Sequence, residues 1–332
     1  MSARYAASFA GLLRPQRKLR IVVACGNGTA GLFAPSILAA AGITVIPLDC
    51  QLDADFPNCD PNPEDVLMLG RLGEAVRTSG ADAGLAFDGD GDRCGFADET
   101  GRAISADRVG LLLARGMALR HPGSHFLADV KSTGLFARDP VLRESGATVE
   151  YWKTGHSYMR QRLLETRALA AFEKSGHFFF NHPEGLGYDD AIATGLAFCR
   201  LLGNGASVSQ LDASLGTGFV TPTMSPHCPD HCKYQVVDAV TRHYQDRRMS
   251  GATMAGHAII AINRLSGARI ELADGSWGLV RASSNKPELT VVCESPASEA
   301  MMHTVFADID AHLASYPDVG PYNQKIAKPH KS

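Results

Sequence analysis

The sequence predicts an α/β protein: two successive α/β domains with mixed or parallel sheets, followed by a smaller C-terminal α+β domain. Three observations support this fold class. The chain has 332 residues, too many for one ordinary domain and enough for two or three. Up to about residue 203, apolar runs alternate with amphipathic stretches, which favours parallel sheets. The last part groups its apolar runs before one helical stretch, which is typical of an α+β domain.

The first domain is expected at residues 1–105. Its apolar, β-branched runs and its helical stretches alternate as a βαβ unit followed by one more helix and strand. In chain order we expect a strand at 19–25, a helix at 32–42, a strand at 43–50, a helix at 66–80 and a strand at 81–87. Residues 53–65 are dense in Pro, Asp and Asn and are expected to form a loop.

The second domain is expected at residues 106–225 and the third at 226–332. For the second we expect helices at 105–120, 135–146, 157–167 and 189–203 and strands at 124–130, 148–153 and 168–174. Residues 221–235 concentrate Pro, Cys and His, so we interpret them as a linker. The third domain is expected to form strands within 269–295, with a tight turn, and a helix at 298–316.

The composition excludes several classes of protein. The net charge is -3, with 20% charged and 45% hydrophobic residues, so we expect no nucleic-acid partner. An anionic substrate must then be bound by local groups. No stretch approaches the roughly 18 apolar residues of a membrane span, and the N-terminus lacks a signal-peptide h-region. The eight cysteines are scattered, which indicates reduced thiols in a cytoplasmic protein.

The segment GNGTAG places Gly26, Gly28 and Gly31 between an expected strand and helix, with Asp49 at the end of the next strand. This is the context of a dinucleotide-binding turn, and taken alone it suggests an NAD-dependent enzyme. A glycine-rich strand-to-helix turn in any βαβ unit would look the same. Three later motifs have no place in a dehydrogenase, so this interpretation becomes the less favoured one.

The segment DGDGDR places Asp88, Asp90 and Asp92 within five residues, directly after an apolar strand. Alternate side chains of an extended segment share a face, and the intervening glycines allow a tight turn. Three hard oxygen donors suit Mg²⁺, which also removes their mutual repulsion. A solvated acidic turn is the alternative, but the carboxyl end of a strand is where α/β sheets bind ligands. We therefore predict a magnesium site.

Polar groups also follow other predicted strands. In FEKSGHFFF, Glu173, Ser175 and His177 alternate, and together they could bind sugar hydroxyls while His177 moves a proton. An ordinary polar turn is equally compatible with this segment. Lys131 and His156 each follow a strand, and each alone is more typical of a surface residue.

In RASSNKP, Arg281, Ser283, Ser284 and Asn285 offer short hydrogen-bonding groups and one guanidinium, a plausible phosphate cradle. The alternative is a hairpin loop rich in turn residues. The segment HCPDHC at 227–232 could suggest zinc, but it lacks a second paired half, so we interpret it as part of the linker.

Taken together and in this order, these motifs resemble those of the α-D-phosphohexomutases, the phosphomannomutase/phosphoglucomutase family. DGDGDR is similar to the family's metal loop. EKSGH resembles its sugar-binding loop, with Phe172 where the family has glycine. RASSNKP resembles its phosphate-binding loop, with Ser-Ser-Asn in place of Ser-Asn-Thr. DVKSTG and KTGHS resemble segments that supply a lysine and a histidine to the substrate. The resemblance covers nearly the whole chain and implies the phosphohexomutase type of fold.

The resemblance implies a mutase that interconverts a hexose 1-phosphate and a hexose 6-phosphate of mannose or glucose. In that family a phosphoserine at Mg²⁺ phosphorylates the substrate, the hexose 1,6-bisphosphate reorients, and the other phosphate returns to the serine. The implied metal ligands are Asp88, Asp90 and Asp92. Implied catalytic residues are His177, Lys131 and Arg93. Implied substrate-binding residues are His156, Glu173, Ser175, His177, Arg281, Ser283, Ser284 and Asn285.

The family's phosphoserine lies in a first-domain loop that reads Thr-Ala-Ser-His-Asn-Pro, and the 332 residues contain no such loop. The segment 181–183 reads Asn-His-Pro but has no preceding serine in that arrangement. We therefore expect this polypeptide to correspond to family domains 2, 3 and 4 and to have little or no turnover alone. A separate chain with the serine domain is an expected partner. A non-catalytic protein that binds sugar phosphate and Mg²⁺ is the alternative function.

Overall fold

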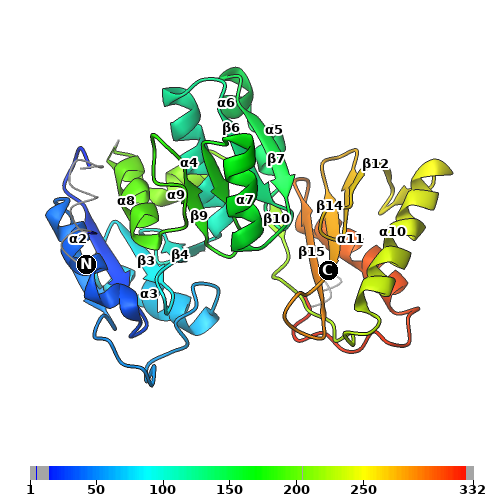
Figure 1. Cartoon of the computed structure of the whole chain (residues 1–332), viewed down its shortest axis with the longest axis horizontal. Helices are drawn as coiled ribbons and strands as arrows, with labels where there is room; N and C mark the ends of the chain where they lie inside the picture. Colours follow the sequence, from blue (N-terminus) through cyan, green and yellow to red (C-terminus); the bar gives the residue numbers. More distant parts are fainter. Residues whose placement is uncertain (1–4, 6–14, 204, 327–332) are drawn as a thin grey trace. The chain divides into compact units, whose positions relative to one another are not determined.

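The computed structural model describes residues 5, 15–203 and 205–326. The chain divides into two compact units (Figure 1). The first contains residues 1–132, 138–151 and 155–216, and the second contains residues 133–137, 152–154 and 217–332. Among the residues that the structure describes, the first unit carries two mixed sheets and most of the helices, and the second carries an antiparallel sheet, two long helices and most of one short helix. The predicted fold class is confirmed.

The first sheet has the strand order β2-β1-β3-β4-β5. Its strands are β1 (Arg20–Ala24), β2 (Thr44–Leu48), β3 (Ala83–Phe87), β4 (Cys94–Ala97) and β5 (Ala103–Ile104). The pairs β1–β2 and β1–β3 are parallel, as the βαβ pattern predicts, whereas β3–β4 and β4–β5 are antiparallel. The chain therefore reverses directly after β3, and the aspartates occupy this reversal.

Three helices of this region lie between residues 15 and 80, and only the last of them is long. They are η1 (Thr29–Leu32), α2 (Ala34–Ala40) and α3 (Val66–Ser79). Asp65 caps α3 by accepting the Met68 amide, and Gly80 ends the helix in the left-handed conformation. The helix predicted at 32–42 is shorter than expected, because a 3₁₀ turn precedes α2.

The second sheet has the order β7-β6-β8-β9. Its strands are β6 (His125–Asp129), β7 (Thr148–Trp152), β8 (Ala170–Phe172) and β9 (Phe178–Phe180). The helices in this stretch of the chain are α4 (Ala106–Arg120), α5 (Leu135–Arg138), α6 (Pro140–Glu144), α7 (His156–Thr166), α8 (Ala191–Leu202) and α9 (Val208–Ala213), and residues 135–137 of α5 belong to the second unit. The single helix predicted at 135–146 is wrong. Asp139 is extended and caps α6, and Pro140 begins the new helix, so the two short helices cannot be continuous.

The sheet of the second unit has the order β10-β15-β14-β13-β12-β11. Its strands are β10 (Phe219–Val220), β11 (Thr253–Met254), β12 (His257–Asn263), β13 (Ala268–Leu272), β14 (Trp277–Ala282) and β15 (Leu289–Ser295), and its helices are α10 (Lys233–Met249) and α11 (Glu299–Leu313). The buried faces of these elements share one hydrophobic core.

The interpretation of residues 221–235 as a linker is wrong. Met224 and Cys228 are fully buried, and Cys232 is nearly so, all within the core of the second unit. The helix α10 begins inside this segment at Lys233. Pro, Cys and His are dense here because the chain turns tightly into a helix while its thiols pack inward, not because it is exposed. Among the described residues, no helix is both long and apolar enough to cross a bilayer.

Candidate functional site

The aspartate loop, residues 88–93, connects β3 to β4 and is organised around Asp88. This side chain is almost completely buried. Its Oδ1 accepts the backbone N–H groups of Gly91, Asp92 and Arg93, each at 3.0 Å, and its Oδ2 accepts Arg93 Nε at 2.7 Å. Burial alone would raise the pKa of Asp88, but the hydrogen bonds from Arg93 outweigh it and lower the pKa. Asp88 is thus an ionised anchor that fixes the turn.

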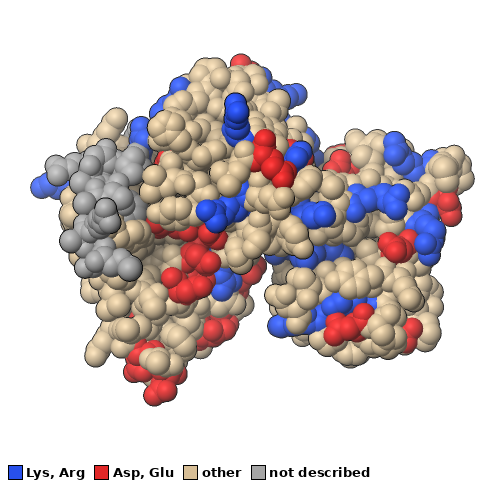
Figure 2. All heavy atoms as spheres, in the orientation of Figure 1, with Lys and Arg blue, Asp and Glu red and all other residues tan. Residues whose placement is uncertain are grey.

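The structure brings the three aspartates together. One oxygen from each of Asp88, Asp90 and Asp92 lies within 4.8 Å of the other two. Burial, together with the charges of Asp88 and Asp90, raises the pKa of Asp92 to about 7, against the opposing effect of His177. A set of three carboxylate oxygens fits Mg²⁺, whose charge would relieve this repulsion. On the face drawn in Figure 2, acidic side chains gather on the first unit.

The glycine-rich turn at 26–31 packs against the backbone of the aspartate loop at Gly89. Thr29 donates its N–H and its hydroxyl to the carbonyl of Gly89, at 2.9 and 3.0 Å. A Cβ at Gly28 would lie 2.9 Å from the Gly89 backbone, and one at Gly31 would lie 2.1 Å from the carbonyl oxygen of Cys50. Asp49, which follows the next strand as in a dinucleotide-binding turn, is paired with Arg71 at 2.7 Å. Close backbone packing therefore accounts for glycine at positions 28 and 31 without a dinucleotide.

The EKSGH loop, residues 173–177, is the tight connection between β8 and β9. Glu173 N–H donates to the His177 carbonyl, and Gly176 N–H donates to the Glu173 carbonyl, both at 3.0 Å. Gly176 has φ +100°, and a Cβ there would lie 2.8 Å from the Cys94 carbonyl oxygen. The conformation and the contact both require glycine.

Backbone pairing joins the EKSGH loop to the aspartate loop. Arg93 and His177 form an antiparallel bridge, and Cys94 N–H donates to the Gly176 carbonyl at 3.1 Å. The two loops belong to different sheets of the first unit. The bridge thus places the metal-binding candidates beside the polar groups of EKSGH, a contact that neither motif predicts alone.

The imidazole of His177 lies among carboxylates. Its Nδ1 is 3.0 Å from Asp189 Oδ2 and 3.6 Å from Asp92 Oδ1. Burial alone would lower the pKa of His177, but Asp189, Glu173 and Asp92 together raise it. The ring centroid of His156 lies 5.8 Å away. This environment suits a group that takes up and releases a proton near neutral pH.

Glu173 makes a contact that its motif does not predict. The side chain is buried, and its Oε1 accepts the Gly155 N–H at 2.5 Å. Burial and the charge of Asp129 raise its pKa to about 7, against the effects of the Gly155 hydrogen bond, His177 and Lys131. One oxygen therefore fixes the start of α7, where His156 is the first residue. Lys131 is also buried, at 8% exposure, whereas Ser175 is partly exposed.

The RASSNKP loop, residues 281–287, lies in the second unit and connects β14 to β15. Arg281 pairs with Thr290 across the two strands, and Ser283 N–H donates to the Glu288 carbonyl at 3.0 Å. Ser284 and Asn285 are exposed at the tip. The structure therefore contains a polar hairpin here, and Lys and Arg side chains are visible on this unit in Figure 2.

Sequence reasoning missed Asp189 and Asn62. Asp189 pairs with His177, and Asn62 Oδ1 accepts Arg93 Nη1 at 3.2 Å. Both contacts depend on chain segments far apart in sequence. One signal was available for Asp189: two aspartates precede α8, and only Asp190 serves as its N-cap. The other acid was free to face a different partner.

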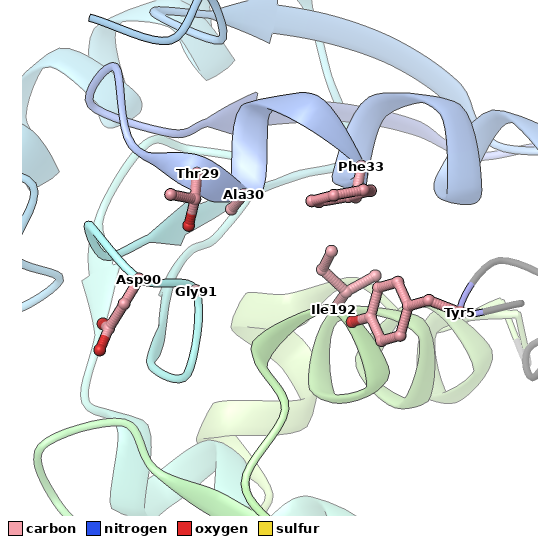
Figure 3. Close-up of a pocket in the computed structure, with 7 residues that line it drawn as sticks. All are labelled: Tyr5, Thr29, Ala30, Phe33, Asp90, Gly91 and Ile192. Atoms are coloured by element: carbon pink, nitrogen blue, oxygen red, sulfur yellow. The ribbon is translucent and has the colours of Figure 1, made fainter. Parts of the chain in front are cut away.

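A pocket of about 330 Å³ borders the aspartate loop (Figure 3). It is lined by Tyr5, Thr29, Ala30, Phe33, Asp90, Gly91 and Ile192. Phe33, Ile192 and the Tyr5 ring form an apolar end, and the Tyr5 hydroxyl donates to Asp190. Neither His177 nor Glu173 lines this pocket. The polar groups described above, rather than the pocket, define the candidate site.

Two family models match the chain. The model described as phosphoglucomutase/phosphomannomutase, alpha/beta/alpha domain II, matches residues 3–101. The corresponding model of alpha/beta/alpha domain III matches residues 105–216. Together they cover the aspartate loop and the EKSGH loop.

Individual proteins agree with the family models. A Pseudomonas putida phosphomannomutase/phosphoglucomutase is 35% identical over 317 residues, which make up 95% of this chain and 63% of the relative. The crystal structure of a phosphoglucomutase/phosphomannomutase family protein from Burkholderia thailandensis has 31% identity and a TM-score of 0.83, over 96% of this chain and 65% of that one. An Aspergillus fumigatus N-acetylphosphoglucosamine mutase in complex with GlcNAc-6P and magnesium is similar in fold, with 15% identity and a TM-score of 0.63, over 93% of this chain and 64% of that one.

The chain thus spans less than two thirds of the length of these three proteins. Within that span, the motif order, the sheets and the family models all agree. The chain belongs to the phosphoglucomutase/phosphomannomutase family, the α-D-phosphohexomutases.

Proposed function

We propose that these 332 residues supply the metal, sugar and phosphate loops of a mutase that interconverts hexose 1-phosphate and hexose 6-phosphate. The observation that supports the proposal is the Arg93–His177 bridge, because the imidazole of His177, our candidate proton carrier, lies next to the three aspartates. A phosphoryl-transfer site needs a cation, a positive side chain and a proton carrier close together. All three requirements have candidates within the first unit.

Asp88, Asp90 and Asp92 would hold Mg²⁺, consistent with their oxygen-only donor set. When bound, the cation would neutralise charge on phosphate oxygens. Arg93 is oriented from two sides, by Asp88 and by Asn62, so its guanidinium is preorganised beside the metal ligands. We assign it the role of stabilising charge on the phosphoryl group in transit.

As the bond between phosphorus and the serine oxygen breaks and the bond to the sugar oxygen forms, the leaving serine oxygen would take a proton from a second carrier. His177 would take the proton from the sugar hydroxyl that attacks phosphorus. In the return step it would give the proton back. Asp189 would hold the ring in place and support its charged form. Lys131, buried and close enough to Glu173 to influence its pKa, is a second candidate proton carrier.

The remaining residues would bind the substrate. Ser175 and His156 would contact the hexose, with Glu173 positioning the start of α7 and offering its second oxygen to sugar hydroxyls. In the second unit, Arg281, Ser283, Ser284 and Asn285 would hold the phosphate that does not react. The hexose 1,6-bisphosphate would be the intermediate.

The phosphoryl donor would come from outside the 332 residues of this sequence. None of them forms a Thr-Ala-Ser-His-Asn-Pro loop, so we propose that a serine-bearing domain, on a longer or a separate chain, completes the site. The 332-residue polypeptide alone should then show little or no turnover. Detection of a phosphoserine in an isolated, active 332-residue chain by mass spectrometry would contradict this part of the proposal.

The test is reconstitution. The chain is mixed with the separately expressed serine-bearing domain of a family relative, Mg²⁺ and glucose 1,6-bisphosphate, and conversion of glucose 1-phosphate to 6-phosphate is followed. We expect turnover in the mixture, none with either component alone, and a large loss with Asp90→Asn. Without turnover, calorimetric binding of hexose phosphate that Asp90→Asn or Arg281→Ala weakens would support a non-catalytic binding protein. Unchanged binding in both variants would contradict both functions.

A further inference from the structure

A second group of metal-ligand side chains lies in the second unit, at the start of α10. One ligand atom each from His231, Cys232 and Asp318 lies within 4.8 Å of the other two. Cys228 Sγ lies 3.9 Å from Cys232 Sγ, on the buried side of the group. This cluster has no part in the mutase function proposed above. Its ligands are also different from those of the aspartate loop, because two are thiols and one is an imidazole.

We propose that Cys228, His231, Cys232 and Asp318 form a zinc site. Thiolate, imidazole and carboxylate are the ligands that Zn²⁺ binds, usually four in a tetrahedron. Two thiolates at tetrahedral Zn–S distances of ~2.3 Å lie about 3.8 Å apart, close to the 3.9 Å between these sulfurs. A site with two sulfur ligands selects zinc over Mg²⁺, so the chain would hold different metals in its two units.

Backbone pairing brings Asp318 to the cluster. His227 N–H donates to the Pro321 carbonyl at 3.0 Å, and Gly320 N–H donates to the His227 carbonyl at 2.8 Å. These bonds hold the segment after α11 against the segment before α10. His231, Cys232 and Asp318 are therefore held near one another before any ion binds, and Cys228 adjoins this group through Cys232. Asp318 supplies a fourth ligand, which the motif HCPDHC does not contain.

The four groups differ in burial, so one side of the site faces solvent and the other faces the core. His231 and Asp318 are exposed, whereas Cys232 is 7% exposed and Cys228 is fully buried. An ion would enter from solvent at the imidazole and carboxylate and reach the thiols beneath. Once bound, it would tie the C-terminal segment to α10 and stabilise the second unit.

The test measures zinc binding to the whole chain under reducing conditions. The chain is stripped with a chelator, reloaded with Zn²⁺ in excess Mg²⁺, desalted, and its zinc is counted by mass spectrometry. We expect one zinc per chain and a higher unfolding temperature with zinc. Substitution with Co²⁺ should give tetrahedral visible bands and a thiolate-to-cobalt charge-transfer band.

Matched variants locate the ion. Asp318→Asn and His231→Gln change exposed side chains and should leave the fold intact, while Cys232→Ser removes a thiol ligand. Each should weaken zinc binding by roughly tenfold or more. Asp90→Asn, in the aspartate loop, and Cys59→Ser, a thiol of the first unit, should bind zinc as the parent does. Absence of bound zinc, a cobalt spectrum without charge transfer, or parental zinc affinity in Cys232→Ser and Asp318→Asn would overturn the proposal.

Discussion

The aspartate loop and the RASSNKP loop both connect neighbouring antiparallel strands, but they are built in opposite ways. In the aspartate loop, one buried carboxylate accepts three backbone N–H groups and a guanidinium nitrogen. The turn at 26–31 packs against it, and Gly176 contacts the strand that follows. The RASSNKP loop instead has exposed residues at its tip, closed by the Ser283–Glu288 backbone bond.

The two loops are therefore constrained in sequence for different reasons. Asp88 serves the fold and the chemistry together, because removing its carboxylate leaves backbone N–H groups and Arg93 without their acceptor. Ser284 and Asn285, at the exposed tip of the RASSNKP loop, have no such role in the fold, so ligand binding alone can determine these residues. A change at the buried Asp88 should therefore alter stability, whereas changes at the exposed Asp90 and at the tip of the RASSNKP loop should alter ligand affinity alone.

The largest expected effect is that of Asp88→Ala. It removes the acceptor of three backbone N–H groups and leaves Arg93 without its carboxylate, so we expect a loss of about 3–5 kcal/mol in the free energy of unfolding. Urea denaturation measures it. Asp90→Asn is the control, because Asp90 is exposed and should change stability by only about 0.5 kcal/mol. Equal losses of stability in the two variants would show that Asp88 does not anchor the turn more than Asp90 does.

The packing of the glycine-rich turn predicts the next effect. In Gly31→Ala the new methyl would lie 2.1 Å from the Cys50 carbonyl oxygen, and we expect a loss of about 1–3 kcal/mol. Gly70→Ala is the matched control, because no atom lies within 4 Å of its new methyl and Gly70 lies inside α3. That variant should gain about 0.5–1 kcal/mol. Equal unfolding temperatures for Gly31→Ala and Gly70→Ala would show that the turn is loosely packed.

A smaller effect should appear as pH dependence. The folded chain raises the pKa of Glu173 from its ordinary value, near 4.5, to about 7, so the folded state binds more protons than the unfolded state between these values. The contribution of Glu173 to stability should therefore fall as pH rises from about 4.5 to 7. Glu173→Gln keeps an acceptor for Gly155 and should flatten this part of the stability profile. A profile with the same slope in both proteins would contradict the buried, partly protonated state of Glu173.

The smallest expected effect on stability belongs to Asn285→Ala. Its side chain is exposed, so the unfolding free energy should change by only about 0.5 kcal/mol. Binding of a hexose phosphate, measured by calorimetry, should nevertheless weaken by roughly fivefold, because one hydrogen bond is lost. Ser250→Ala, an exposed change elsewhere in the second unit, should leave binding unchanged. A stability loss above about 1 kcal/mol without a change in binding would give this loop a structural role instead.

The sequence predicted best what lies within one short segment. Strands such as β1 and β3 have continuous apolar runs, and the three aspartates share one turn, so both were visible locally. Contacts between distant segments were not visible. The Arg93–His177 bridge, the pairing of Asp189 with His177, and the position of Asp318 depend on how sheets and segments meet.

In two segments, a local sequence pattern gave the wrong prediction because another effect was stronger. The break at Pro140 outweighed the helical pattern of 135–146, and burial of Met224 and Cys228 outweighed the turn-rich composition of 221–235. Strands β4, β9 and β12 were missed for a different reason. β4 and β9 have only four and three residues, too few to show a period, and β12, although longer, lies in a segment for which we made no prediction. Tertiary pairing, rather than propensity, fixes these elements.

The most direct test of the preformed metal loop is a crystal of this chain soaked with Mn²⁺, a substitute for Mg²⁺, with anomalous difference density measured at the manganese edge. The account predicts one peak among the carboxylates of Asp88, Asp90 and Asp92, and its loss in Asp90→Asn. Asp92, His177 and Asp189 form the competing group of ligands within 4.8 Å. A peak there instead, or no peak at the aspartate loop, would contradict the account.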